Sequence, residues 1–115
     1  MTERQCRDQA QRNLKVYEHL KDRYVDWAAV ALFCSALHHV DAWLQRQGIR
    51  RPGGHMARAQ YLARCGVPDA VQSAYQSLRE VSELARYHSW SGLLDLSRLD
   101  QLRSNEYQTV VDHLR

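Results

Sequence analysis

The sequence contains few of the residues that interrupt helices. Its 115 residues include only two prolines and five glycines, so long helices are permitted over most of the chain. No stretch alternates polar and apolar residues over a useful length, and no β-strand is therefore predicted. With 44% apolar and 25% charged residues, the chain has the composition of a globular domain with its own core. We expect an all-α fold in which residues 1–115 form a single domain.

Cysteine pairs, an apolar leader and long apolar runs are also missing. Cys6, Cys34 and Cys65 form no CxxC pair, which excludes a zinc ribbon or thioredoxin-like site and indicates reduced thiols. The N-terminus is charged and polar, unlike a signal peptide. The longest nearly apolar run, from Trp27 to Leu37, is shorter than the ~20 residues of a membrane-spanning helix. We therefore expect a cytoplasmic protein without a membrane segment.

Lysine is rare, with two lysines against fourteen arginines, and the net charge is only +3. Arginine suits bidentate contacts to phosphate. The arginines are, however, spread through the chain, as a GC-rich genome would also produce. The overall charge alone does not demand an acidic partner.

Apolar residues recur at helical spacing in several segments. The clearest segment begins near Asp26 and ends before Gly48, and its first half is apolar on nearly all sides, which is typical of a central helix. The loop that follows contains Pro52, Gly53 and Gly54. Because the connections are short, we predict an up-and-down bundle of four long helices plus one short helix. The remaining predicted helices cover residues 2–23, 55–64, 68–89 and 97–113.

Three segments, taken in order, carry a resemblance to a known family. They are the segment around Ser35-Ala36-Leu37-His38 with Asp41-Ala42, the pair His55-x-x-Arg58, and residues 74–87. In this arrangement, from about residue 24 to residue 88, the chain resembles HEPN proteins (higher eukaryotes and prokaryotes nucleotide-binding). That family includes metal-independent RNases, toxins, and non-catalytic modules associated with nucleotides or RNA, and its members commonly work as dimers.

The resemblance implies a helical homodimer, without a cofactor, that binds RNA or a nucleotide in a toxin or defence system. An alternative is a non-catalytic module that partners a nucleotidyltransferase or another protein encoded nearby. RNase members carry an R-x4-6-H motif after the third long helix. Here Arg79 is too far from His88 and Arg86 is too near, so the motif is absent from its usual place. Arg50 and His55 match the spacing elsewhere, in the Gly-Gly loop, and whether the protein is a metal-independent endoribonuclease stays open.

His38 and Asp41 are three positions apart on the central helix, so their side chains share a face. Each needs a partner, since an unpaired buried polar group costs about 1–3 kcal/mol. Two interpretations are open. Asp41 could orient His38 as a general base or phosphate ligand. Alternatively, Arg58 or Arg86 could brace both residues in a buried network.

His55 and Arg58 begin the short predicted helix, directly after Gly53-Gly54. A helix N-terminus preceded by glycines lets backbone N–H groups approach an anion. With Arg50 or Arg51 nearby, this arrangement predicts a phosphate site. The alternative is that Gly-Gly is merely a flexible connection.

Arg86, Tyr87 and His88 end the fourth predicted helix. Arginine beside aromatic rings suits stacking on bases, although positive charge also complements a helix C-terminus. No metal site is predicted, because His38 and Asp41 lack a third ligand and HExxH is missing. The candidate catalytic residues are therefore His38, Asp41 and His55, and the candidate phosphate- or RNA-binding residues are Arg50, Arg51, Arg58, Arg86, Tyr87 and His88.

Overall fold

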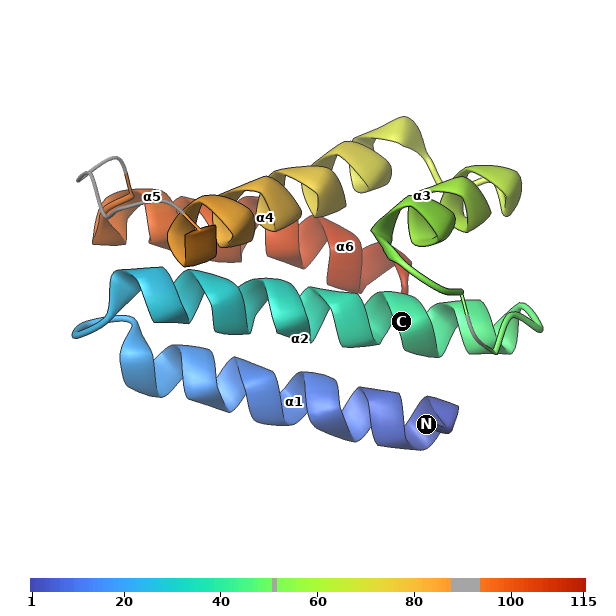
Figure 1. The fold of residues 1–115 in the computed structure, drawn as a ribbon, viewed down its shortest axis with the longest axis horizontal. Coiled ribbons are helices and arrows are strands. Elements are labelled where there is room, and N and C mark those ends of the chain that lie inside the picture. Colours follow the sequence, from blue (N-terminus) through green and yellow to red (C-terminus); the bar gives the residue numbers. More distant parts are fainter. Residues whose placement is uncertain (51, 88–93) are drawn as a thin grey trace.

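The computed structural model describes residues 1–50, 52–87 and 94–115, and every regular element in these ranges is helical (Figure 1). The prediction of an all-α fold is confirmed for this part of the chain. The elements are α1 (Glu3–Leu20), α2 (Val25–Arg46), α3 (His55–Arg64), α4 (Asp69–Tyr87), α5 (Leu96–Gln101), the π-helical turn η1 (Leu102–Tyr107) and α6 (Gln108–His113).

The helices form a bundle whose long members alternate in direction (Figure 1). α5, η1 and α6 follow one another without a break and together make one long helix. α2 is the central element, since it packs against α1, α4 and the last long helix. The short α3 packs against α4 near the C-terminal end of α2. The described residues thus form the predicted all-α bundle of four long helices and one short helix.

α1 begins at a capping box. The backbone N–H of Gln5 donates to Thr2 Oγ1 (3.1 Å), and the backbone N–H of Thr2 donates to Gln5 Oε1 (2.8 Å). The apolar stripe of α1 faces α2, with Cys6, Ala10 and Tyr17 buried. α1 ends at Leu20 rather than near residue 23, because a tight turn leads directly into α2.

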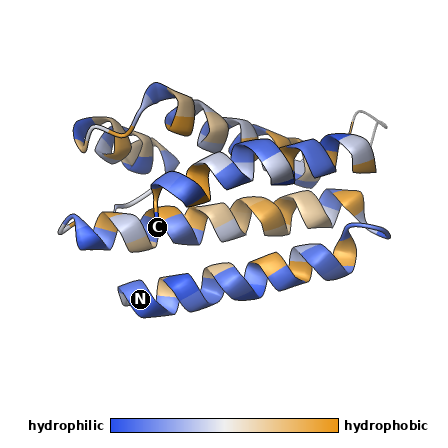
Figure 2. Ribbon diagram, turned by 180° about the vertical axis from the view of Figure 1, so that it is seen from behind, coloured by the Kyte–Doolittle hydropathy of each residue, from blue (hydrophilic) through white to orange (hydrophobic). Residues whose placement is uncertain are grey.

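α2 carries most of the core. Ala28, Leu32, Ala36, Val40 and Leu44 are fully buried, at intervals of one helical turn. The small alanines let neighbouring helices approach closely at the beginning of α2. Figure 2 shows hydrophobic residues along most of α2, whereas α1 is largely hydrophilic.

α2 also has the length and composition of a membrane-spanning helix, with a mean hydropathy of 1.2 over its most apolar window. The uninterrupted apolar run from Trp27 to Leu37 is too short to span a membrane, but α2 as a whole is longer and remains apolar beyond that run. In the structure, 61% of that window is buried inside the bundle. Its burial explains its apolar character, because a core helix needs the same residues as a spanning one.

The last long helix departs from the prediction of a regular α-helix over 97–113. The structure inserts the π-helical turn η1 between Leu102 and Tyr107, which are both buried although they are five positions apart. In an α-helix, this spacing would place the two side chains about 140° apart around the axis. The wider π turn brings both onto the core side. Leu99 and Val110 continue the same buried stripe on either side of the turn.

Candidate functional site

A bidentate ion pair joins α3 to α2. Arg58 Nε donates to Asp41 Oδ1 (2.7 Å) and Arg58 Nη2 donates to Asp41 Oδ2 (3.0 Å). The two side chains are only 15% and 17% exposed. Burial acts to lower the pKa of Arg58, but the hydrogen bond and negative charge of Asp41 outweigh it, so the pKa is raised and the guanidinium stays charged. For Asp41, the structure shows the bracing arrangement that was one of the two alternatives.

His38 lies almost one turn before Asp41 on α2. Its Nδ1 atom is buried and has no hydrogen-bond partner among the described residues. Both carboxylate oxygens of Asp41 accept from Arg58, and no described hydrogen bond links Asp41 to His38. Burial lowers the pKa of His38, Asp41 raises it and Arg58 lowers it further, with a net lowering. His38 is therefore a neutral imidazole at pH 7, without the orienting carboxylate of a base–acid pair.

His55 is the first residue of α3 and lies over an aromatic floor. Its ring centroid is 5.7 Å from that of Phe33 on α2, and Phe33 is 5.6 Å from Tyr75 on α4. The Nδ1 atom of His55 is buried without a partner in the described structure, as is the hydroxyl of Tyr75. Burial, followed by the charges of Arg79 and Arg58, lowers the pKa of His55. This second imidazole is therefore also neutral, and it lies in a positive field.

α4 contributes the exposed charges beside His55. Arg79 is half-buried and donates from Nε to Glu83 Oε1 (3.1 Å). Arg86 is exposed, and its guanidinium carbon lies 4.6 Å from the ring centroid of Tyr87, to whose hydroxyl it also donates. Arg86 contributes to lowering the pKa of His55, although burial is the larger cause. Arg86 and Tyr87 therefore form an aromatic–guanidinium pair with each other.

The Gly-Gly loop reaches α3 through a backbone that favours glycine. Gly53 has φ +91°, in the left-handed region that side chains rarely adopt, and Gly54 is the N-cap of α3. No side chain caps this helix end. Arg50 is exposed and makes no hydrogen bond or ion pair in the described structure. The predictions for Arg51 and His88 fall outside the described residues.

Sequence reasoning missed three residues that shape this region: Phe33 and Tyr75, which form the floor, and Arg79. Phe33 lies in an apolar run and Tyr75 at helical spacing from other apolar residues, so the sequence indicates core positions for both and does not show that His55 lies over them. Arg79 was considered only for the RNase motif. Its position two helical turns before Arg86 places both on one side of α4, a signal that the sequence does contain.

A second buried polar network lies behind α2. Arg7 Nη1 on α1 donates to the carbonyl oxygen of Leu114 (2.8 Å) and lies 3.0 Å from His39 Nδ1. Burial and then the charge of Arg7 lower the pKa of His39 to about 4. Next to it, Ser35 Oγ donates to the carbonyl oxygen of Ala10 (2.7 Å) and lies 2.7 Å from Tyr107 Oη. The buried members of this network face other helices, so we assign it a structural role.

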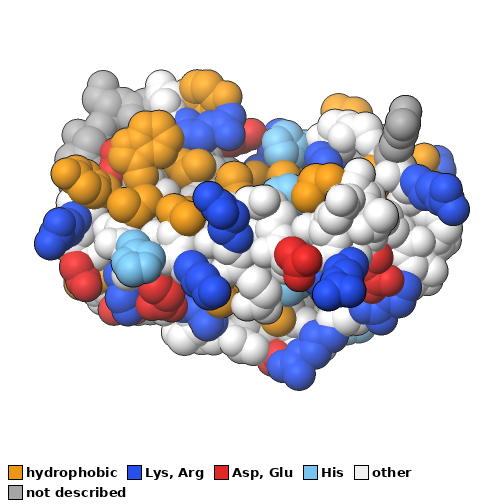
Figure 3. Space-filling model, turned by 90° about the horizontal axis from the view of Figure 1, so that it is seen from below, with side chains coloured by type: hydrophobic (Ala, Val, Ile, Leu, Met, Phe, Trp, Pro, Cys, Tyr) orange, Lys and Arg blue, Asp and Glu red, His pale blue; other side chains and the backbone are white. Residues whose placement is uncertain are grey.

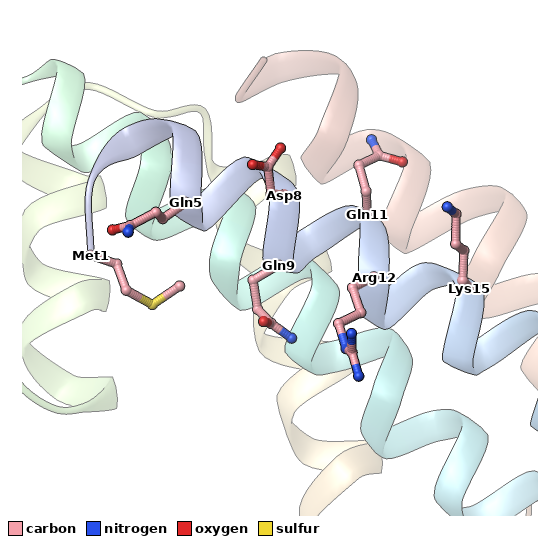
Figure 4. A pocket seen from close by; sticks show the side chains of 7 residues that line it. All are labelled: Met1, Gln5, Asp8, Gln9, Gln11, Arg12 and Lys15. Atoms are coloured by element: carbon pink, nitrogen blue, oxygen red, sulfur yellow. The ribbon is translucent and has the colours of Figure 1, made fainter.

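A hollow of about 720 Å³ lies along the outer face of α1 (Figure 4). No buried, unpartnered polar atom belongs to its lining residues. We therefore regard it as the space between long exposed side chains. The lining residues are Met1, Gln5, Asp8, Gln9, Gln11, Arg12 and Lys15.

The arrangement of α2, α3 and α4 thus offers two neutral imidazoles beside fixed guanidinium charges. It can bind an anion and accept a proton. No group of three or more metal-ligating side chains gathers anywhere in the described ranges. Comparison with protein-family models, curated proteins and solved structures finds no match to this chain.

Proposed function

We propose that this chain is a HEPN-like cytoplasmic protein that binds RNA or a nucleotide at the surface between α2, α3 and α4. The observation that carries this proposal is the pair of buried, unpartnered imidazole nitrogens of His38 and His55 beside three arginines. A buried polar atom without a partner is rare in a folded protein, and a bound ligand is one way to satisfy it. Phosphate is the anion whose geometry best suits guanidinium groups.

The arginines have different roles in the proposed site. Arg58 directs two donors at Asp41, so its main role is to hold α3, and with it His55, against α2. Arg86 is exposed and is free of any carboxylate within hydrogen-bonding distance in the described structure. Arg86 is therefore the first contact expected for a phosphate that approaches His55, and Arg79, which already pairs with Glu83, adds positive charge beside it.

Cleavage at this surface would need no metal ion. His55 is neutral, so it can accept the proton of a ribose 2′-hydroxyl as that oxygen attacks the adjacent phosphorus. The bond from phosphorus to the 5′-oxygen of the next nucleotide then breaks, which leaves a 2′,3′-cyclic phosphate, and the departing oxygen takes a proton from water. The neighbouring arginines would stabilise the charge that grows on the phosphate oxygens. His38 is the second candidate base.

Binding of a short, labelled, single-stranded RNA tests the proposal. Fluorescence anisotropy should show affinity that falls steeply between 50 and 200 mM salt. Arg86→Gln should weaken binding and reduce the slope of log K against log salt by about 0.7, the value of one phosphate contact on a single strand. Arg12→Gln is the matched control, since Arg12 is an exposed arginine on the outer face of α1. Equal effects of both variants would contradict a defined site.

The rival function is a non-catalytic module that partners a nucleotidyltransferase or another protein, and the exposure of Tyr24 and Trp27 favours it. These rings are 57% and 58% exposed at the beginning of α2. Large exposed aromatics are typical of protein interfaces. Salt-insensitive binding of a protein partner, without RNA binding, would support this function. The HEPN resemblance also implies a homodimer, which sedimentation of the purified protein tests.

A further inference from the structure

One side of α2 is only half covered. α3 lies over its C-terminal part, where Arg58 pairs with Asp41 and His55 lies over Phe33. Towards the N-terminus, Trp27, Val30 and Cys34 follow one another at intervals of three and four residues on the side that continues to His38 and Asp41. We call these three residues the open stripe.

The open stripe is apolar and accessible. Trp27 is 58% exposed, and Val30 and Cys34 are partly exposed, although α2 is otherwise the most buried helix. Figure 3 shows hydrophobic side chains gathered on one part of the surface, with Lys, Arg and His side chains close by. Exposed apolar side chains that cluster in this way are typical of interaction sites, whereas single exposed apolar residues are common on any surface.

The border of the stripe on α4 is positive and aromatic. α4 packs against α2 and ends, with Arg86 and Tyr87, at the end of the bundle where α2 begins (Figure 1). The charge of Arg86 also acts on Cys34, although burial is the larger effect and raises the pKa of that thiol. Tyr87, which packs against the Arg86 guanidinium, is 70% exposed. Two nearby carboxylates, Asp41 and Glu83, are already paired with arginines.

We infer that the open stripe and Tyr87 receive the unpaired bases of a single-stranded RNA whose phosphates contact Arg79 and Arg86. This inference deepens the proposed function and rests on it. Flat aromatic rings beside guanidinium groups bind single strands, because each base has a face that can stack. A duplex hides its base faces within its own stack, so it cannot use Trp27 in this way.

Charge and length favour this occupant over a protein helix. The positive border matches a polyanion, and Asp26, next to Trp27, would repel a phosphate but not a base. Along α2, the distance from Trp27 to His38 is about 16 Å at ~1.5 Å per residue, which corresponds to about five nucleotides at the ~3.4 Å spacing of a stacked strand. Trp27 and His38 would therefore contact different nucleotides of one strand.

The test compares three ligands of equal length: a single-stranded RNA, the same sequence in a duplex, and an abasic ribose-phosphate strand. Trp27→Leu keeps an apolar side chain but removes the ring, and Trp27→Phe keeps a smaller ring. Trp27→Leu should weaken binding of the single-stranded RNA about 5- to 100-fold, the value of one stacked base, and leave the abasic strand unaffected. Trp27→Phe should recover part of the loss. Leu96→Ala, at another exposed apolar residue, is the control.

The outcomes separate the two proposals. Equal binding of the three ligands, with dependence on Arg86 and salt, would overturn base stacking and leave the phosphate site intact. Absence of salt-dependent binding to any ligand would overturn both. If Trp27→Leu instead converts a dimer to a monomer without weakening RNA binding, the stripe is covered by a second copy of the chain and the inference is wrong. Circular dichroism and thermal unfolding of each variant establish that the fold is retained.

Discussion

Ser35 Oγ and Tyr107 Oη lie 2.7 Å apart inside the bundle, and this contact ties the π-helical turn η1 to α2. Ser35 also donates to the carbonyl oxygen of Ala10, so one buried hydroxyl connects three helices. Ser35 is completely buried, and Tyr107 is almost so.

Removal of the Tyr107 hydroxyl and removal of the Ser35 hydroxyl should lower the free energy of unfolding by different amounts. Tyr107→Phe loses one hydrogen bond, and we expect the free energy of unfolding to fall by about 1 kcal/mol. Ser35→Ala leaves both the Tyr107 hydroxyl and the Ala10 carbonyl without this partner, and should cost roughly 2–3 kcal/mol. Urea unfolding of the two single variants and the double variant measures both values and their coupling. Equal losses in the two single variants would show that Ser35 does not connect the helices.

The ion pair between Asp41 and Arg58 should be visible in stability. Asp41→Asn removes the charge that compensates a largely buried guanidinium, and we expect a loss of about 2 kcal/mol. Glu18→Gln, in the exposed pair with Lys21, should change stability little. Because α3 would loosen, amide exchange should accelerate in α3 more than in α1. Uniform acceleration would argue that the pair braces the whole bundle rather than α3.

His39 should make the protein sensitive to acid. Its pKa is about 4 in the folded state, below the ordinary value of 6.5, because burial disfavours the charged ring. Between these values the unfolded chain binds the extra proton, so stability is present above about pH 6.5 and is lost as the pH falls towards 4. The loss could reach roughly 3 kcal/mol from this residue.

His39→Gln should flatten that pH dependence of the unfolding free energy, measured between pH 7 and pH 4. His19→Gln is the control, since His19 is exposed on α1. If the His39 variant retains the wild-type slope, another group carries the acid sensitivity. His38 and His55, whose pKa values burial also lowers, are the next to replace.

The π turn predicts an unusual tolerance to deletion. Removal of the exposed Asn105 shortens the interval between Leu102 and Tyr107 to four residues, which a regular α-helix accommodates with both side chains on the core side. Deletion of Thr109, one turn beyond the bulge, should instead rotate Val110 away from the core. Thermal unfolding should therefore show a much smaller loss for the first deletion. Similar losses would mean that the π turn itself is required.

RNA cleavage without metal is the remaining prediction. End-labelled RNA incubated with a chelator should be cut by the wild-type protein, and His55→Ala should abolish the cut by removing the base. Arg58→Ala should reduce it by releasing α3. His113→Ala, at the end of α6, is the control. Salt-dependent binding without cleavage would identify a binding module and exclude catalysis.

The helices were predictable because their signals are local. The α3 bounds, residues 55–64, were predicted correctly from a glycine pair at one end and Cys65-Gly66 at the other. The π turn was not predicted, although the five-residue step from Leu102 to Tyr107 signals it. In a regular α-helix, Glu106, four residues after Leu102, would face the core more directly than Tyr107.

The candidate site was predictable only in part. The sequence left Arg58 and Arg86 as possible partners of Asp41, and the structure shows that the partner is Arg58. The apolar run around Cys34 favours a buried thiol, yet Cys34 is partly exposed. A helix that is apolar on nearly all sides does not reveal which side stays open. In this fold the exposed side of α2 is the part that the short α3 does not reach. The sequence of α2 alone does not indicate which side that is.

α2 is also held against three different neighbours by polar contacts at nearly adjacent positions. Ser35 faces Ala10 and Tyr107, His39 faces Arg7, and Asp41 faces Arg58. A purely apolar helix could slide by one turn or rotate within its bundle and find nearly equivalent packing. Each such movement of α2 would leave at least one buried polar group without its hydrogen-bond partner. These contacts therefore select one alignment among many, so that the side of α2 facing α3 is always the same one.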